Sequence, residues 1–198
     1  MSFAVFTKTM GAPRINESEL LRYAVTSATN EVMKLVKTVT ERYSDIFTYR
    51  VTYTELDVRT KGYNVDLGVF SCTSRTLAAA LSGCDKVYLL AATVGGAVDR
   101  MTSALAITSP AAAHILDSFG TERVESLLDD FSAFLEEDTG CTLRPRVSAG
   151  YGDIPLELQK DIFKALSPES RIGLYLNNSL LMTPMKSVTA FIGVKKEQ

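Results

Sequence analysis

The spacing of apolar residues changes several times along the chain, and each spacing predicts a different kind of element. Between residues 28 and 45 apolar side chains recur every three or four positions, which predicts an amphipathic helix. Residues 47–60 are rich in β-branched and aromatic residues and predict a strand, and residues 63–72 predict a second one, joined to it near Lys61 and Gly62. The continuous apolar run KVYLLAATV at 86–94 predicts a buried central strand.

Later segments alternate between helical and extended patterns. A short helix is expected within 73–83, and a longer one begins at Pro110 and continues to about residue 138, with a break near Gly120. Pro155 is expected to open another helix that ends before Pro168, and the tail 186–196 has the pattern of a strand. The elements show no regular βαβα rhythm and no internal repeat, so an α+β fold and one domain over residues 1–198 are predicted.

Composition narrows the range of functions. The formal net charge of −2 argues against a general electrostatic affinity for nucleic acid. No apolar run approaches the roughly 20 residues that a membrane span requires, and the N-terminal residues do not resemble a secretory signal. The three cysteines are odd in number and lack metal-binding spacing, which is typical of reduced thiols. We therefore expect a cytoplasmic protein without a metal site.

Two features resemble functional motifs only weakly. TVGGAVDR places Gly95 and Gly96 between a strand and a helix, but it matches neither a dinucleotide fingerprint nor a phosphate-binding loop. A tight turn with close packing is the favoured interpretation. His114 is the only histidine, and no nucleophile motif accompanies it, so a structural role on a helix is expected.

The segment RPRVSAGYGDIPLELQ, residues 144–159, carries the richest chemistry. Arg146 offers a planar fork of donors that suits a carboxylate. Gly150 and Gly152 leave backbone groups accessible, and Tyr151 adds a ring face and a hydroxyl. A carboxylate from the preceding helix would complement an ammonium or a sulfonium. Together these groups suit an amino-acid-bearing nucleoside such as S-adenosylmethionine, although the residues alone leave a structural turn equally open.

The same segment resembles the activation (reactivation) domain of cobalamin-dependent methionine synthase. That family carries an arginine, then Pro-Gly-Tyr with the tyrosine five residues after the arginine, then a helix and a segment with Met-x-Pro and Ser-Val. Arg146 and Tyr151 keep the first spacing, and the later pattern falls at Met182, Pro184, Ser187 and Val188. The resemblance covers roughly residues 65–195, whereas residues 1–64 match poorly. It implies an α+β fold with a mixed or antiparallel sheet flanked by helices.

The resemblance also implies a function. The family binds S-adenosylmethionine when its cobalamin has been oxidised to cob(II)alamin, and an electron from flavodoxin or a similar donor then allows remethylation. Carried onto this chain, Arg146 would bind the methionyl carboxylate, and Glu125 would face the ammonium. Tyr151 and the backbone of Val147, Ser148 and Ala149 would contact the adenosyl group. The cobalamin would be supplied by a partner, a methionine synthase that lacks its own activation domain.

Two alternatives remain open beside this hypothesis. The chain could be an interaction module that docks on a corrinoid protein without binding S-adenosylmethionine, or a methyltransferase acting alone on another substrate. The sequence also departs from the family at Ala149, where the family has a proline, so the turn is less rigid.

Overall fold

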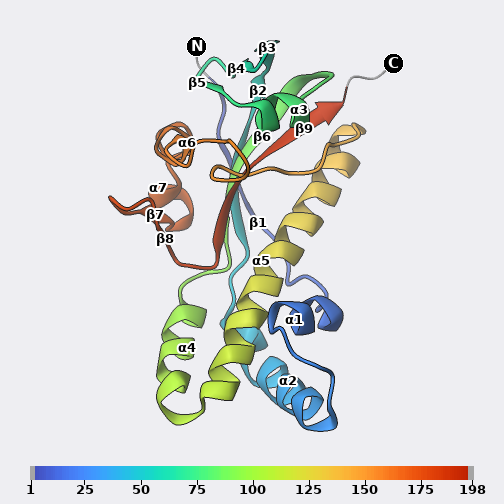
Figure 1. Cartoon of the computed structure of the whole chain (residues 1–198), viewed down its shortest axis with the longest axis vertical. Coiled ribbons are helices and arrows are strands. Elements are labelled where there is room, and N and C mark those ends of the chain that lie inside the picture. Colours follow the sequence, from blue (N-terminus) through green and yellow to red (C-terminus); the bar gives the residue numbers. More distant parts are fainter. Residues whose placement is uncertain (1–2, 196–198) are drawn as a thin grey trace.

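The central element is a four-stranded antiparallel sheet with the strand order β1-β2-β6-β9 (Figure 1). The computed structural model describes residues 3–195. The strands of this sheet are β1 (Phe6–Thr9), β2 (Arg50–Asp57), β6 (Cys84–Thr93) and β9 (Ser187–Lys195). The predicted central strand is β6, and the tail strand pairs beside it as β9. Lys196, the expected end of that strand, lies outside the described residues.

Side chains of β6 alternate between two hydrophobic clusters. Tyr88 and Leu90 point into the first cluster, whereas Val87 and Leu89 point into the second, and all four are at most 5% exposed. The continuous apolar run is thus explained, because a strand that is covered on both faces has no polar side. Each face of the sheet must then be covered by other elements.

Helices cover both faces. The first face packs against α1 (Glu17–Tyr23), α2 (Asn30–Tyr43), α4 (Ala97–Thr108) and α5 (Pro110–Thr139). The second packs against α3 (Arg75–Ala80), α6 (Leu158–Leu166), α7 (Pro168–Ile172) and a small sheet of β3 (Arg59–Lys61), β4 (Asn64–Asp66) and β5 (Ser71–Thr73). A short hairpin of β7 (Tyr175–Leu176) and β8 (Met182–Thr183) projects beside α7 (Figure 1), and a 3₁₀ turn, η1 (Ser44–Ile46), follows α2. The predicted α+β class with antiparallel sheets flanked by helices is confirmed.

The structure corrects the expected break at Gly120, because α5 runs unbroken from residue 110 to 139. A Cβ atom on Gly120 would lie 3.0 Å from Cγ of Lys186 and 3.1 Å from Cγ2 of Val98. The glycine therefore makes room for side chains that cross the helix, and its low helix propensity is tolerated within a long packed element.

Other boundaries also differ from the expectation. The extended region 47–60 is divided at Val58: β2 ends at Asp57, and β3 belongs to the small sheet. Residues 63–72 likewise form two strands, because Gly68 turns the chain and its N–H donates to Asp66 Oδ1 at 2.9 Å. The helix expected from Pro155 begins at Leu158, after a turn.

A buried ion pair ties the N-terminal segment to α5. Glu122 and Arg123 are 1% and 2% exposed, and Arg123 Nε lies 2.5 Å from Glu122 Oε2. The guanidinium also donates to the carbonyls of Pro13 at 2.6 Å and Arg14 at 2.9 Å, while Glu122 Oε1 accepts from the N–H of Asn16. Asn16 in turn caps α1, because its side chain accepts from the N–H of Glu19.

Replacing Arg123 by methionine is expected to lower the free energy of unfolding by about 3–5 kcal/mol, because Glu122 would stay buried without its cation. Urea unfolding of the two proteins measures the difference. Arg22→Met is the matched control, since Arg22 pairs with Glu19 on the exposed side of α1, and no resolvable change is expected there. Equal losses of unfolding free energy in the two variants would contradict the conclusion that the buried Glu122–Arg123 pair stabilises the fold.

Candidate functional site

The segment that follows α5 runs along the outer edge of β9. Arg144 N–H donates to Gly193 O at 2.8 Å, and Val147 exchanges two hydrogen bonds with Phe191, at 3.0 and 2.8 Å. Pro145 lies between these contacts and has no N–H to donate, so the segment makes isolated bridges instead of a regular strand. The backbone pairing therefore sets the position of every residue from 142 to 148.

The two arginines of this segment lie on opposite faces of the sheet. The Arg144 side chain reaches the second face, where its guanidinium donates to the carbonyls of Ala79 and Ala80 at the end of α3, at 3.4 and 3.3 Å. Arg146 reaches the first face and meets α5. Arg144 thus donates to backbone carbonyls at the C-terminal end of α3 that have no partner within the helix. Arg146 is the arginine that lies beside the candidate site.

Arg146 forms two ion pairs with acidic residues one turn apart on α5. Its Nη2 lies 2.6 Å from Glu125 Oε2, and its Nη1 lies 2.6 Å from Asp129 Oδ1. Burial by itself acts to lower the pKa of Arg146, but the hydrogen bonds to Glu125 and Asp129 outweigh it, and the pKa is raised. The guanidinium has five N–H donors and uses two of them within residues 3–195, which leaves three for a ligand.

The loop after Arg146 is held in place by Asp153. Asp153 accepts from the Ser74 hydroxyl at 2.7 Å and from the N–H groups of Arg75 and Thr76, at 2.8 and 2.9 Å. The carboxylate thus caps the start of α3 from outside. Gly152 has a φ of +60°, and a Cβ there would lie 2.6 Å from Thr76 Oγ1. Gly152 therefore allows close packing on α3.

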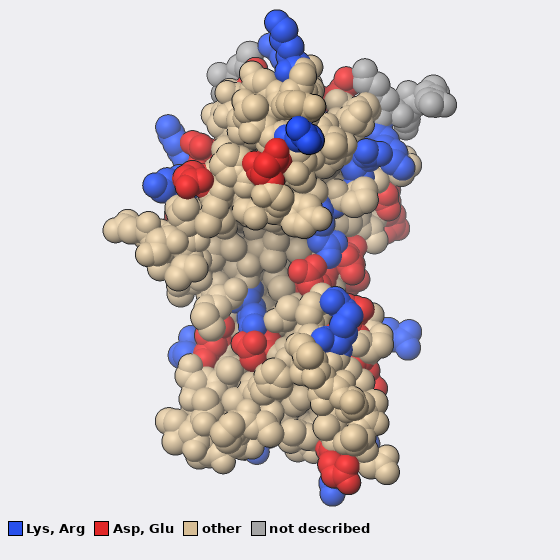
Figure 2. Space-filling model, viewed as in Figure 1, with Lys and Arg blue, Asp and Glu red and all other residues tan. Residues whose placement is uncertain are grey.

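Five of the six predicted site residues line one surface pocket of about 180 Å³. Its lining consists of Glu125, Arg146, Val147, Ser148, Tyr151 and Val188. Ala149 is buried beside it and does not line it. A typical cleft for a small molecule has about 300–1000 Å³, so a nucleoside-sized ligand would extend from this pocket over the adjoining surface. Figure 2 shows that this view of the molecule is hollowed at mid-height, with cationic and anionic side chains interspersed.

Sequence reasoning missed two residues of this site. Val188 lines the pocket, and the Ser-Val pattern of the sequence was the feature that could have identified it. Asp129 pairs with Arg146, and its signal was the i, i+4 spacing from Glu125, which places both carboxylates on one face of a helix.

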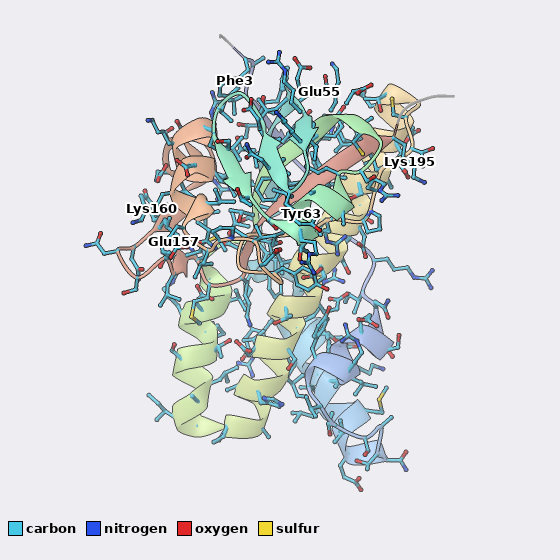
Figure 3. The ribbon with its side chains drawn as sticks, turned by 45° about the horizontal axis from the view of Figure 1, so that its top comes forward. Phe3, Glu55, Tyr63, Glu157, Lys160 and Lys195 are labelled. Atoms are coloured by element: carbon cyan, nitrogen blue, oxygen red, sulfur yellow. The ribbon has the colours of Figure 1, made fainter. Side chains whose placement is uncertain are left out.

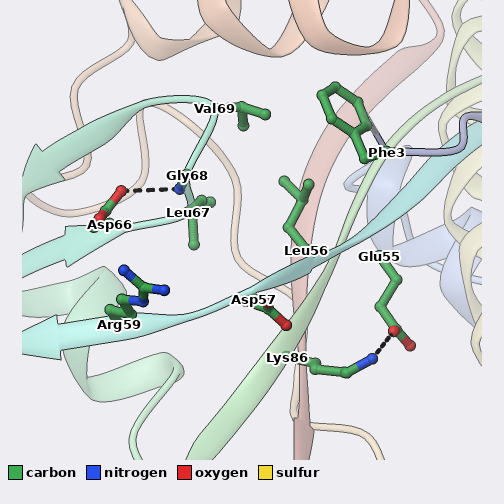
Figure 4. A pocket seen from close by; sticks show the side chains of 10 residues that line it. All are labelled: Phe3, Glu55, Leu56, Asp57, Arg59, Asp66, Leu67, Gly68, Val69 and Lys86. Carbon is green, nitrogen blue, oxygen red and sulfur yellow. Dashed lines mark hydrogen bonds and ion pairs between the residues drawn. The ribbon is translucent and has the colours of Figure 1, made fainter. Parts of the chain in front are cut away.

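A larger cavity of about 370 Å³ lies at the end of the molecule that carries the small sheet (Figures 3 and 4). Phe3, Leu56 and Val69 are among its apolar lining residues, and its charged lining residues are Glu55, Asp57, Arg59, Asp66 and Lys86. Lys86 pairs with Glu55, and Asp66 accepts from Gly68 (Figure 4). Glu157 and Lys160, at the start of α6, lie away from this cavity (Figure 3). No residue of the arginine–tyrosine segment lines it.

The weaker sequence features have structural roles, as expected. Gly95 adopts a φ of +85° and leaves no space for a Cβ, which would lie 2.5 Å from Thr48 Oγ1. His114 Nε2 lies 2.9 Å from the carbonyl of Ala24, at the end of α1. Within residues 3–195, no cluster of potential ligands that could hold a metal is found, and no helix is long and apolar enough to cross a membrane.

Comparison with solved structures finds the same architecture in the "Crystal Structure of the MetH Reactivation Domain bound to AdoHcy". The TM-score is 0.74 at 12% sequence identity, and the match covers 98% of this chain and 79% of that chain. The chain has the fold of the MetH reactivation domain. No family model and no curated protein matches the sequence.

The likeness to the MetH reactivation domain extends beyond the region of sequence resemblance. Because it covers 98% of the chain, it includes most of residues 1–64, where the sequence matches poorly. This is the segment that supplies β1, α1 and α2. Fold similarity at this identity reports how the backbone is arranged; the chemistry of the site must be argued from the side chains of this chain.

The contact between Asp153 and α3 predicts a pH dependence. The Ser74 hydroxyl, followed by the N–H groups of Thr76 and Arg75, holds the pKa of Asp153 well below its usual range. A depressed pKa contributes stability that is present above the unfolded value of about 3.9 and is lost as the pH falls toward the folded value.

Asp153→Asn should therefore melt below the parent protein at pH 7, because the amide places an NH₂ group against a backbone donor. The difference should shrink as the pH falls below about 4. Thermal melts between pH 3 and pH 7 measure it, with Asp130→Asn as the exposed control. A difference that does not change with pH would contradict the role of the charged carboxylate.

Proposed function

We propose that this chain binds S-adenosylmethionine at the Arg146 pocket and supports the reductive remethylation of an oxidised cobalamin carried by a partner methionine synthase. One observation carries the proposal. Residues that the sequence singles out from two distant segments, Glu125 on α5 and the run from Arg146 to Tyr151, line one pocket. The fold likeness to a domain whose crystal structure is described as bound to AdoHcy adds independent support.

The charges of the pocket suit the amino-acid end of the ligand. A ligand carboxylate would take the free N–H donors of Arg146, and the ammonium would lie against Glu125 or Asp129. These two acids hold the guanidinium at 2.6 Å each, so its orientation is set before a ligand arrives. Such preorganisation reduces the entropy lost on binding.

The adenosyl end would meet the turn that follows. Val147 already uses its N–H and C=O in the pairing with Phe191, and the Ser148 carbonyl accepts from Tyr151 N–H. Among the described residues, the N–H groups of Ser148 and Ala149 donate no hydrogen bond. Ser148 lines the pocket, so its N–H is the backbone donor that a purine or ribose could use, whereas Ala149 is buried beside the pocket. Tyr151 is 64% exposed, which leaves its ring available for stacking.

Bound S-adenosylmethionine would supply the methyl group, and this chain would hold and orient it. The chain would act only together with a partner that carries cobalamin and lacks an activation domain, with a flavodoxin-like protein as the electron donor. A cytoplasmic location belongs to the same proposal. The alternative, a corrinoid-docking module that does not bind S-adenosylmethionine, is separated from it by direct binding measurements.

The sharpest test compares the two arginines. Arg146→Ala should weaken the affinity for S-adenosylmethionine by about tenfold to a hundredfold, because a charged hydrogen bond contributes about 1.5–3 kcal/mol. Arg146→Lys should also weaken it, since lysine keeps the charge but loses the planar fork. Isothermal titration calorimetry measures both.

Arg144→Ala is the matched control for this comparison. Arg144 contacts α3 on the opposite face, so its loss should leave the affinity within about twofold of the parent value. Thermal melts confirm that each variant is folded. If folded Arg146→Ala binds S-adenosylmethionine as the parent protein does, the site is wrongly assigned.

The accessory role makes a separate prediction. The isolated chain should catalyse no methyl transfer to small acceptors, because the cobalamin that accepts the methyl group belongs to the partner and Glu125, the carboxylate that lines the pocket, is paired with Arg146. Added to an oxidised methionine synthase that lacks its activation domain, with reductant and S-adenosylmethionine, it should restore activity, and Arg146→Ala should not. Turnover by the isolated chain would instead support an independent methyltransferase.

A further inference from the structure

The cavity at the end of the molecule that carries the small sheet is amphipathic. Its volume of about 370 Å³ lies within the range of pockets that hold small molecules. Figure 4 shows the apolar side chains of Phe3, Leu56 and Val69 on one side of it, and those of Asp57 and Arg59 on the other. The cavity shares no lining residue with the candidate site described above, so it is a separate place at which a ligand can bind.

Two of the charged lining residues form no hydrogen bond and no ion pair through their side chains within residues 3–195. Lys86 pairs with Glu55, and Asp66 Oδ1 accepts from a backbone N–H in its own turn. Asp57 and Arg59 are left, one carboxylate and one guanidinium. They are two positions apart on an extended chain, a separation of about 7 Å between their Cα atoms. A ligand with two opposite charges close together can therefore lie between them.

The backbone of Asp57 is also available to a ligand. Val58 N–H donates to Asp85 O at 2.7 Å, which continues the register of β2 with β6. Successive residues of an antiparallel strand direct their N–H and C=O groups to opposite edges, so those of Asp57 point away from β6. Strand β1 lies on that side, but its pairing with β2 reaches only Tyr53, the partner of Phe6. Within residues 3–195, no strand therefore covers the outer edge of Asp57.

We propose that this cavity binds a free apolar α-amino acid in its zwitterionic form. The carboxylate of the ligand pairs with Arg59, whose planar fork of donors suits it. Its ammonium lies against Asp57, where the side-chain carboxylate and the backbone carbonyl are both acceptors. Its side chain packs among Phe3, Leu56 and Val69 and is thereby removed from water.

The test is isothermal titration calorimetry of the full chain with L-leucine, for which saturable binding at a single site is expected. Three analogues each remove one feature of the ligand. Leucinamide lacks the carboxylate, 4-methylpentanoate lacks the ammonium, and glycine lacks the apolar side chain. Each should bind about tenfold more weakly than L-leucine, or worse, because a charged hydrogen bond or a buried side chain is lost. Equal affinity for an analogue, or no saturable binding of L-leucine, would overturn the proposal.

Two variants assign the binding to the cavity. Arg59→Gln and Asp57→Asn should each lower the affinity for L-leucine by about tenfold. Lys61→Gln is the matched control, since Lys61 is exposed in the same small sheet but does not line the cavity, and its affinity should stay within about twofold of the parent value. Thermal melts confirm that the variants are folded. Parent-like affinity in folded Arg59→Gln and Asp57→Asn would place the ligand elsewhere.

A further variant separates this site from the S-adenosylmethionine site, whose proposed ligand also carries an amino-acid group. Arg146→Ala should bind L-leucine as the parent protein does, and Arg59→Gln should bind S-adenosylmethionine as the parent does, because the two pockets share no residue. Loss of L-leucine binding in Arg146→Ala would show that the amino acid occupies the Arg146 pocket and would overturn the proposal. The proposed function and this inference can thus fail independently.

Discussion

The burial of β6 on both faces is the constraint on which the rest of the structure depends. A single layer of helices is not enough to cover a strand with apolar side chains on both faces, because the second face would remain in water. The chain meets this requirement with two separate hydrophobic clusters, one under α5 and its neighbours and one under α6 and α3. The candidate site lies where the cover of the first face meets the free edge of β9.

Helix α5 serves both the core and the site. Its apolar side packs on the sheet, and its acidic side chains pair with two arginines, Arg123 of the helix itself and Arg146 of the segment that follows it. Arg123 and Arg146 illustrate how burial changes the role of an ion pair. The pair of Arg123 is sealed from water and joins two parts of the fold, whereas that of Arg146 is partly exposed and keeps donors free. Only the second arrangement can exchange partners with a ligand, because water can reach it.

Much of the fold could be predicted from periodicity. The long helix and the central strand have strong patterns over 30 and 10 residues, and both are found close to the expected positions. Short elements were missed: β1, α7 and the β7–β8 hairpin contain two to five residues, too few for a period to show. The predicted break at Gly120 was wrong because propensity describes a residue in isolation, whereas Lys186 and Val98 fill the space that the missing side chain leaves.

The sequence by itself determined which residue types could form a site: an arginine, a tyrosine and two glycines at a characteristic spacing, and a helix with acidic residues upstream. It could not determine that Arg144 and Arg146 face opposite sides of the sheet, because that depends on the irregular pairing around Pro145 along β9. It also could not show that Asp129 joins Glu125 at the guanidinium. Residue types and hydrophobic periodicity can be read directly from the sequence. The face to which a side chain of residues 142–148 points is decided only when that segment pairs with the edge of β9.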